Sequence, residues 1–420
     1  MSRFLWTQKQ DVGPSARFGH AMAYDATRQQ TLLFGGADST GLALRDTWGW
    51  DGEFWTQLSD IGPAARSEHG LCFDLADNVA FLFGGASGSY FGDSWQWNGQ
   101  DWTQVEDSGP SARYGHGLVW DSSRSRAVLF GGENAAAQLL GDTWEWDGQS
   151  WTQVEDTGPS ARVYAAMAFD PVQKRTIVFG GHGNAGELAD TWTWDGSKWT
   201  QVQDIGPSAC LRSAMASSDA ASLMYGGLSS AATNPPPQIF GASWVYSGGH
   251  WTERQDIGPG ARWGHALAYD SARRTFVFFG GATGIVGSGG ALRDDTWEHA
   301  ETDPPAQTGS GGNTGNSGTP QIVLSPSSAQ AGQQVTVQLI VAPSNAAASF
   351  EVAWIRDSRW QAIMNGASPQ ANDFNLIGAV SIPPQATSAT VTFTVPAVGE
   401  AIVVVAADSQ SIVASADLPA

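Results

Sequence analysis

The chain repeats one unit six times, and this repetition constrains its fold more than any other feature of the sequence. Each unit contains a Gly-Pro-x-Ala segment, a pair of adjacent glycines and, in most copies, Asp-Thr-Trp followed by Trp-Thr-Gln. The glycine pairs begin at Gly35, Gly84, Gly131, Gly180, Gly226 and Gly280, at intervals of 49, 47, 49, 46 and 54 residues. A period of this length with paired glycines and regularly spaced aromatic residues is typical of a β-propeller, in which each unit forms one blade.

The third unit, around Gly131, indicates how one blade is built. Its four predicted strands are His116–Trp120, Ala127–Phe130, Thr143–Trp146 and Trp151–Val154. The last two are joined by Asp147-Gly148, a dipeptide that favours a two-residue hairpin turn. Equivalent Asp-Gly or Asn-Gly pairs occur in three other units, so the same antiparallel arrangement is expected along the array.

These residues resemble the kelch repeat, which has an arginine before the first strand, two glycines after the second and aromatic residues in the third and fourth. The resemblance covers residues 1–300 and implies a six-bladed kelch-type β-propeller with a central channel. Unit six ends after Trp297 without a Trp-Thr-Gln segment, and the missing segment occurs at Trp6. We therefore expect the N-terminal strand to complete the sixth blade and to close the ring.

The remainder of the chain differs in composition. Residues 301–320 are rich in Gly, Pro and Ser and are predicted to be a linker. Residues 321–420 contain few tryptophans and several alternating runs such as Val335 to Val341, which predict a small β-sandwich. This segment resembles the immunoglobulin-like domains appended to bacterial surface proteins, with Ser325-Pro326 through Gln333 as its motif-like part. The expected fold class is therefore all-β throughout.

The overall charge disfavours two classes of partner. A formal net charge of −20 repels nucleic acid and anionic membranes. No apolar run is long enough for a transmembrane helix, and the N-terminal residues lack a signal-peptide pattern. The appended domain nevertheless leads us to expect an extracellular or cell-surface protein, with a cytoplasmic protein or a component of a particle as the alternative.

The arginine position that precedes the first strand of each unit is interpreted as structural. It is occupied by Arg17, Arg66, Arg113, Arg162, Cys210 and Arg262. Unit five, which has Cys210, also has Ala242 where the other units place the aspartate of Asp-Thr-Trp or Asp-Ser-Trp. Because the two partners disappear together, we expect each arginine to pair with that aspartate. Three positions after the arginine, four units place a histidine, for which a hydrogen-bonded scaffold role is favoured over a metal site.

Candidate functional residues are those that break the repeat on the rim formed by the arginine segments and the loops after the glycine pairs. The position between the arginine and the histidine reads Gly19, Glu68, Gly115, Tyr164, Arg212 and Gly264. With neighbouring positions that vary in the same way, the candidate ligand-binding residues are Glu68, Tyr114, Glu133, Tyr164, His182, Arg212 and Trp263. Tyr114, Tyr164 and Trp263 are expected to be exposed, where they would stack on sugar rings.

The favoured function is a non-catalytic binding or structural module. Its rim would bind a protein or a glycan, and its C-terminal domain would attach it to a cell surface or a larger assembly. No cofactor, metal or catalytic residue is predicted, since the sequence lacks a nucleophile motif and a short-range set of metal ligands. Glu68, Glu133 and His182 are the only metal-ligand combination that the rim suggests.

Two alternatives remain open. The first is an enzyme acting on a small sugar or metabolite at the rim, resembling the six-bladed sialic acid mutarotases or the galactose-oxidase type of radical oxidase. The oxidase would need a cysteine crosslinked to a tyrosine, whereas Cys72 reads as a core residue and Cys210 has no such partners. The second alternative is a component of a phage-like or injection particle.

Overall fold

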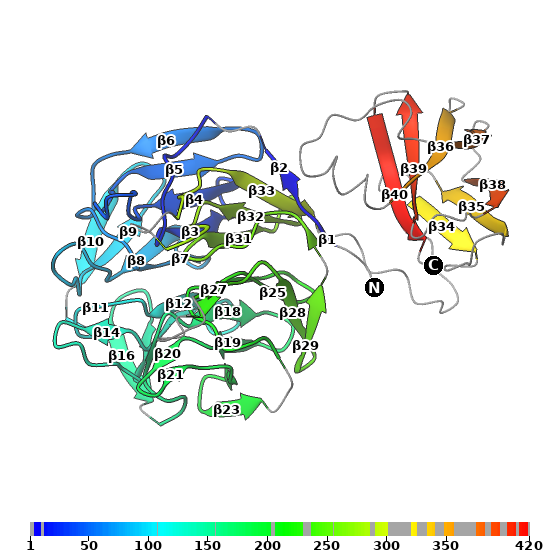
Figure 1. The fold of residues 1–420 in the computed structure, drawn as a ribbon. Coiled ribbons are helices and arrows are strands. Elements are labelled where there is room, and N and C mark those ends of the chain that lie inside the picture. The colour runs from blue at the N-terminus through cyan, green and yellow to red at the C-terminus, as the bar shows by residue number, and fades with distance from the viewer. Residues whose placement is uncertain are drawn as a thin grey trace. The chain divides into compact units, whose positions relative to one another are not determined.

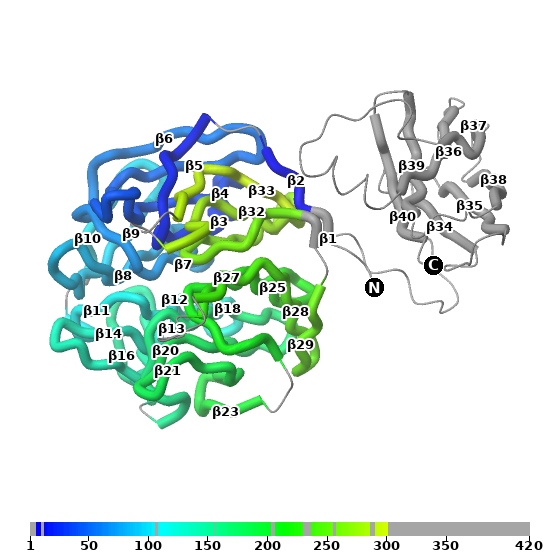
Figure 2. The backbone as a smooth tube through the Cα atoms, in the orientation of Figure 1, coloured from blue at the N-terminus to red at the C-terminus, as the bar shows by residue number. Residues whose placement is uncertain are grey.

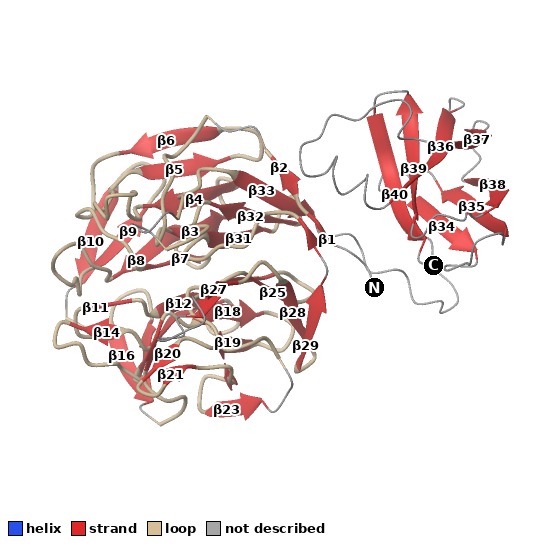
Figure 3. Cartoon of the chain, viewed as in Figure 1, coloured by secondary structure: helices blue, strands red, loops and turns tan. Residues whose placement is uncertain are grey.

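The computed structural model describes residues 4–9, 12–106, 108–155, 157–202, 206–229, 237–254, 256–285 and 290–300, together with seven strands between Gln321 and Leu418. All regular structure in these residues is β-strand (Figure 3). They include no helix that is long and apolar enough to cross a membrane. The chain separates into two compact units, Met1–Pro304 and Pro305–Ala420, and the predicted linker at 301–320 lies outside the described residues.

The described part of the first unit contains six four-stranded antiparallel sheets, one for each sequence repeat (Figure 1). The first two are β3 (Ala21–Asp25), β4 (Gln30–Phe34), β5 (Thr47–Trp50), β6 (Trp55–Ser59) and β7 (Gly70–Asp74), β8 (Val79–Phe83), β9 (Ser94–Trp97), β10 (Trp102–Glu106). The next two are β12 (Gly117–Asp121), β13 (Arg126–Phe130), β15 (Thr143–Trp146), β16 (Trp151–Glu155) and β18 (Ala166–Asp170), β19 (Arg175–Phe179), β22 (Thr191–Trp194), β23 (Trp199–Val202). The last two are β24 (Ala214–Ser217), β25 (Ser222–Tyr225), β28 (Ser243–Ser247), β29 (His250–Arg254) and β31 (Ala266–Asp270), β32 (Thr275–Phe279), β33 (Thr296–Ala300), β2 (Thr7–Gln8).

The first strands of the six sheets, β3, β7, β12, β18, β24 and β31, contact one another in a closed series. We call them the inner strands. Bulky residues of one inner strand pack on small residues of the neighbouring one: Met22 of β3, for example, packs with Ala266 and Ala268 of β31. This alternation allows the sheets to approach closely around their common centre.

The N-terminal strand completes the sixth sheet. β2 pairs antiparallel with β33, with Thr7 opposite Glu298 and Gln8 opposite Trp297. In Figure 2 the blue N-terminal segment accordingly runs beside the yellow-green segment of β33. The preceding Trp6 is 2% exposed and packs edge-on against Tyr225 and Phe278. A short parallel pair, β1 (Phe4–Leu5) with β30 (Asp256–Ile257), adds a second tie to the neighbouring segment.

Tryptophans from the fourth strands join adjacent sheets. The Nε1 of Trp199 in the fourth sheet donates to the Oγ1 of Thr143 in the third, at 2.9 Å. The same bond recurs in other sheets, for example from Trp102 to Thr47 at 2.8 Å. The glycine of each Gly-Pro segment provides the space for this indole, since a Cβ on Gly62 would lie only 2.5 Å from Trp102. This close approach explains why the Gly-Pro segment recurs in every unit.

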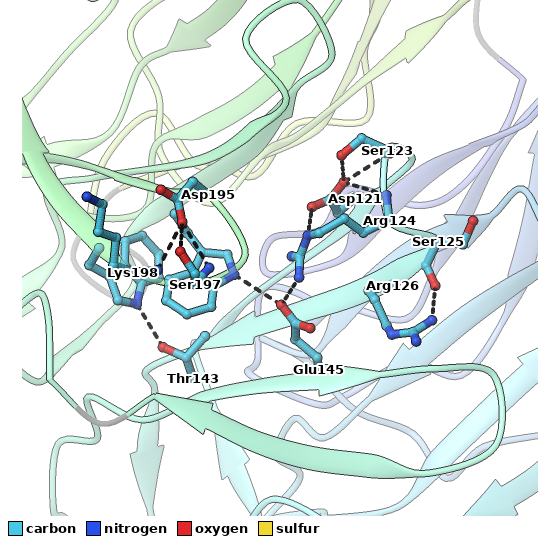
Figure 4. Close-up of polar contacts among 12 residues, drawn as sticks. Asp121, Ser123, Arg124, Ser125, Arg126, Thr143, Glu145, Asp195, Ser197 and Lys198 are labelled. Atoms are coloured by element: carbon cyan, nitrogen blue, oxygen red, sulfur yellow. Dashed lines mark hydrogen bonds and ion pairs between the residues drawn. The ribbon is translucent and has the colours of Figure 1, made fainter.

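Charged residues add a further tie on the same face of the third sheet, which Figure 4 shows together with Thr143. Arg124 follows β12 and bonds Asp121 at 2.7 Å and Glu145 at 2.5 Å. Glu145 also accepts a hydrogen bond from Nε1 of Trp194, at 3.0 Å. One carboxylate therefore joins an arginine of its own sheet to a buried tryptophan of the next.

The predicted arginine–aspartate pairs are confirmed. In the second unit, Arg66 bonds both carboxylate oxygens of Asp93 at 2.7 and 2.9 Å and the carbonyl oxygen of Gly84 at 2.8 Å. Nε1 of Trp95 donates to the same carboxylate at 2.7 Å. The other pairs are Arg17–Asp46, Arg113–Asp142, Arg162–Asp190 and Arg262–Asp295. Burial alone would raise the pKa of Asp93, but its bonds to Arg66 outweigh burial and lower that pKa below its usual value.

The C-terminal unit contains two antiparallel sheets. The first consists of β34 (Gln321–Ser325), β35 (Gln334–Ile340) and β38 (Ser388–Thr394). The second consists of β37 (Asn375–Ile382), β36 (Ala348–Arg356), β39 (Ala401–Asp408) and β40 (Ser411–Leu418). Strands of both sheets therefore occupy the segment that the sequence assigned to a separate β-domain.

Candidate functional site

Six residues, one from each unit, form a cycle of backbone hydrogen bonds at one end of the inner strands. They are Gly19, Glu68, Gly115, Tyr164, Arg212 and Gly264, which we call the mouth ring. The N–H of each residue donates to the carbonyl oxygen of the ring residue in the preceding unit: Glu68 donates to Gly19 at 2.7 Å, for example, and Gly19 closes the cycle by donating to Gly264 at 2.8 Å. The position that breaks the sequence repeat is therefore also the position that links the six units around the centre.

The backbone of the mouth ring is left-handed at every position. Glycine adopts this conformation freely, but Glu68, Tyr164 and Arg212 do so with φ of 56°, 62° and 56°. A residue with a side chain in this region costs about 1–3 kcal/mol, and such strain is concentrated at functional sites. The glycines also make room for their neighbours, since a Cβ on Gly19 would lie 3.0 Å from the carboxylate of Glu68. The three substitutions therefore carry a cost that packing alone does not explain.

Arg212 lies at the centre of the charged and aromatic groups on the ring. Its guanidinium stacks 3.9 Å from the ring centroid of Tyr164 and 5.0 Å from that of Trp263. Its Nη2 lies 3.1 Å from Oε1 of Glu68, and the two side chains are 18% and 14% exposed. Glu68 belongs to unit two and Arg212 to unit five, three places apart in a closed series of six. The ion pair therefore spans the mouth ring.

The electrostatic surroundings keep Arg212 charged. Burial opposes the positive charge of Arg212, but Glu68 and Tyr164 outweigh it and raise the arginine's pKa above its ordinary value. Burial and the nearby Glu68 raise the pKa of Tyr164, so its hydroxyl stays neutral at physiological pH. At the mouth ring, the guanidinium of Arg212 therefore lies against the rings of Tyr164 and Trp263 and beside the carboxylate of Glu68.

Tyr114 and Glu133 extend this cluster along the rim. They lie opposite each other in the pair β11 (Arg113–Tyr114) and β14 (Glu133–Asn134), and the hydroxyl of Tyr114 donates to Oε1 of Glu133 at 3.1 Å. The ring of Tyr114 lies edge-on to Tyr164 at 5.7 Å and also contacts Tyr90 at 4.9 Å. Burial raises the pKa of Tyr114, as do Tyr164 and Glu133. A continuous set of aromatic contacts therefore leads from the second unit to Arg212.

Trp263 differs from its expected placement, and Tyr114 and Tyr164 are half-buried, although the sequence predicts that all three are exposed. Trp263 is 5% exposed, packs against Phe18 at 5.4 Å and donates from Nε1 to the carbonyl oxygen of Gly284. The expectation that it is exposed for sugar stacking is therefore wrong, because its ring is covered by neighbours and by Arg212. His182 lies in β20 (His182–Gly183) and pairs with Val163 through the backbone. It does not line the cavity at the mouth ring that the next paragraph describes.

A cavity of about 110 Å³ lies at the mouth ring. Besides ring residues, it is lined by the four histidines that follow them, His20, His69, His116 and His265. Burial, reinforced by the charges of Arg17 and Arg113, lowers the pKa of His20 and His116 to about 3. The carbonyl of Phe279 lies near enough to offset this slightly for His20, but no imidazole nitrogen of the four makes a hydrogen bond of regular geometry.

The histidines act as packing elements between units. The ring of His69 lies edge-on to Phe34 of the first sheet at 5.4 Å, and His116 lies in the same way against Phe83 of the second at 5.5 Å. Within the part of the chain that the structure describes, no three His, Cys, Asp or Glu side chains are placed to hold a metal ion. The contacts of His69 and His116 are those of a scaffold, but they are ring contacts, and the hydrogen bonds predicted for the four histidines are not made.

Comparisons with known proteins agree with this architecture. Residues 97–281 match the family described as the KLHDC2/KLHL20/DRC7 Kelch-repeats domain. The solved structure titled "Structure of YjhT" matches with a TM-score of 0.55 and 14% sequence identity, over 69% of this chain and 97% of that one. No curated protein sequence matches the chain. The chain contains kelch repeats in an all-β propeller fold; at this identity, the likeness to the solved structure concerns the fold alone.

Proposed function

We propose that the first unit is a six-bladed propeller, closed by β2, that serves as a non-catalytic binding module for a protein partner at the mouth ring. The observation that carries this proposal is the placement of Arg212 between Tyr164 and Trp263 and against Glu68, on a strained backbone. Arginine, tyrosine and tryptophan in a partly covered cluster are the residues that dominate protein interfaces.

The size of the cavity favours a partner that lies across the mouth. Sites that enclose small molecules have volumes of about 300–1,000 Å³. The cavity at the mouth ring, at about 110 Å³, accommodates a single side-chain group of a larger partner. A protein is favoured over a glycan because Trp263 is buried and leaves fewer open aromatic faces for sugar rings.

The C-terminal unit supports an attachment role. We propose that residues 321–420 form an immunoglobulin-like β-sandwich, joined through a linker at 301–320 to a propeller at 1–300. Its two antiparallel sheets are compatible with that class of fold. In this proposal the module works outside the cell or at its surface, where the C-terminal domain joins a larger assembly.

The test is affinity capture with the immobilised full chain, using lysate and culture medium of the organism that encodes it, with captured proteins quantified by mass spectrometry. Arg212→Ala is expected to lower capture of the specific partner at least about tenfold, the usual effect of removing an interface hot spot. Arg126→Ala, at the first residue of β13, is the matched control and should leave capture unchanged. Equal capture by the parent protein and both variants would contradict the proposal. Arg212-dependent binding on a glycan array, without capture of a protein, would identify the ligand as a glycan instead.

An enzyme acting on a small sugar or metabolite is the second candidate. The observation in its favour is that Glu68, Tyr164 and Arg212 converge above the cavity. A carboxylate and a guanidinium in this arrangement would serve as proton acceptor and anion-holding group. This alternative predicts that the protein accelerates the mutarotation of a sugar, which NMR measures, and that Glu68→Gln abolishes the acceleration. A binding module would not accelerate mutarotation.

A further inference from the structure

A second and larger cavity lies between the inner strands. It begins at the level of His20, His69, His116 and His265, which we call the histidine layer, and lies on the side away from the mouth ring. Its volume is about 450 Å³, within the range of about 300–1,000 Å³ that is typical of small-molecule sites. All six inner strands contribute to its lining, which includes His69, His116 and His265 from the layer below the mouth ring. From there the cavity extends along the strands to residues of the turns after them, such as Ala26 and Leu75.

The lining of this cavity is nearly free of charge. Among its lining residues there is no lysine or arginine, and Asp219, at the end of the fifth inner strand, is the only carboxylate. Its lining includes the alanines of the inner strands and, at one equivalent position, six side chains that are 7–8% exposed: Met22, Leu71, Leu118, Met167, Met215 and Leu267. Methionine side chains adapt their shape to irregular apolar ligands. A charged ligand would therefore find no counter-charge deep in the cavity, and an uncharged one fits its chemistry.

The end of the cavity far from the mouth ring is aromatic. Five inner strands have an aromatic residue at the equivalent position near their ends: Tyr24, Phe73, Trp120, Phe169 and Tyr269, of which Phe73 is buried and the other four are half-buried. Each of these residues is four positions after the histidine position of its unit, and a strand rises about 3.3 Å per residue, so its Cα lies about 13 Å beyond that position along the strand. Unit five has Ser217 at the same position, which leaves one side of the aromatic circle open.

The inner strands also offer polar groups to a ligand. Each of them is the terminal strand of its sheet, so one edge of its backbone has no strand partner within that sheet. The N–H and C=O groups of such an edge form hydrogen bonds with any polar atoms placed beside them. The cavity thus combines apolar walls with backbone hydrogen-bonding groups.

We propose that this cavity is a second binding site, entered from the face opposite the mouth ring, for an uncharged, largely apolar molecule that carries an aromatic ring. The aromatic circle would receive the ring, and the methionines and alanines would contact its apolar body. Leu75, which lines this end and is 49% exposed, extends the apolar surface to the entrance. The site is separate from the one proposed at Arg212.

The experiment uses N-phenyl-1-naphthylamine, an uncharged dye whose emission rises in apolar surroundings, titrated into the full chain. Saturable binding at one site is expected. Ala214 is half-buried, borders the cavity and also packs against the core cluster that contains Leu267, so Ala214→Phe displaces the inner strands and reduces the cavity; it should weaken dye binding at least about tenfold. Arg212→Ala, at the mouth ring, should change the dissociation constant by less than about twofold.

A second variant protects the test against misfolding. Ser217→Trp completes the aromatic circle at the entrance, where Ser217 is half-buried and bonds Ser222 at 2.7 Å. It should alter dye affinity by at least about threefold while the melting temperature stays near that of the parent protein. Absence of saturable binding, or the same affinity in folded Ala214→Phe and Ser217→Trp, would overturn the proposal. Loss of dye binding in Arg212→Ala alone would place the dye at the mouth ring instead.

Discussion

Arg66 and Glu68 are two residues apart in one segment, but they belong to two regions that vary differently between units. Arg66 belongs to the arginine layer, which consists of Arg17, Arg66, Arg113, Arg162 and Arg262, and Glu68 belongs to the mouth ring. The arginine layer repeats the same residue in five of six units and gives it the same aspartate, carbonyl and tryptophan partners. The mouth ring keeps the same backbone in all six units but changes the side chain in three of them. In a repeat protein, a position with constant partners therefore marks scaffold, and one with constant backbone but variable side chains marks a candidate site.

The largest predicted effect concerns the arginine layer. Arg66→Ala leaves Asp93 partly buried without its cation and should lower the free energy of unfolding by about 3–5 kcal/mol. Urea unfolding followed by tryptophan fluorescence measures this, since most tryptophans lie in the first unit. The matched control is Cys210→Ala, at the equivalent position of unit five, where no aspartate is left unpaired. Equal losses in the two variants would contradict a scaffold role that depends on the ion pair.

A smaller effect is predicted for the histidine layer, and it depends on pH. His20 has a pKa of about 3 in the folded protein and about 6.5 when unfolded, so the unfolded chain binds more protons below pH 6.5. The stabilisation is complete above about pH 6.5 and is lost as the pH falls toward 3, by up to about 1.4 kcal/mol per pH unit. Asp93, whose folded pKa is lowered below about 3.8, loses its contribution only at more acidic pH.

His20→Gln tests this difference. Urea unfolding at pH 6 and pH 5 should show a slope about 1 kcal/mol per pH unit smaller than that of the parent protein, because one buried titrating group has been removed. Asp93→Asn should leave the slope in this interval unchanged. A slope that is identical in His20→Gln and the parent protein would show that the histidine is not buried in its neutral form.

The smallest stability effect is predicted for the mouth ring itself. Glu68→Gly relieves about 1–3 kcal/mol of left-handed backbone strain but leaves the partly buried Arg212 without its carboxylate, so the two terms largely cancel and the net loss of stability should be about 1–2 kcal/mol. Capture of the protein partner should nevertheless fall with this variant. The control Gly115→Ala introduces the strain and brings a Cβ within 2.5 Å of Val163, so it should destabilise the protein. Strong destabilisation by Glu68→Gly would show that the side chains of the mouth ring have a structural role.

The sequence predicts the regular part of this molecule well, for a physical reason. Repeated residues such as Arg66 and Trp102 make the same local contacts in several units, so the pattern itself reveals their partners. The joint loss at Cys210 and Ala242 identified the arginine–aspartate pair in the same way. The pairing of β2 with β33 follows from counting strands.

The contacts within the candidate site were less accessible to sequence reasoning. Arg212 and Glu68 come from units that are far apart in the chain, and only the closed ring brings them together. The burial of Trp263 depends on Phe18 from the first unit, which no local pattern reveals. The left-handed backbone of the ring did have a signal, because glycine alternates there with larger residues, but its cyclic hydrogen bonds require the closed structure.

The pairing of β2 with β33 has a consequence for the timing of synthesis. Gln8 leaves the ribosome about 290 residues before its partner Trp297. At about 5–20 residues per second, β2 waits about 15–60 s for the sheet that it completes. During that interval five sheets can assemble while the sixth position stays open, with Trp6 available to chaperones or to another nascent chain. For this protein, the fidelity of closure is therefore decided only after β33 has been made, while the C-terminal unit is still to be synthesised.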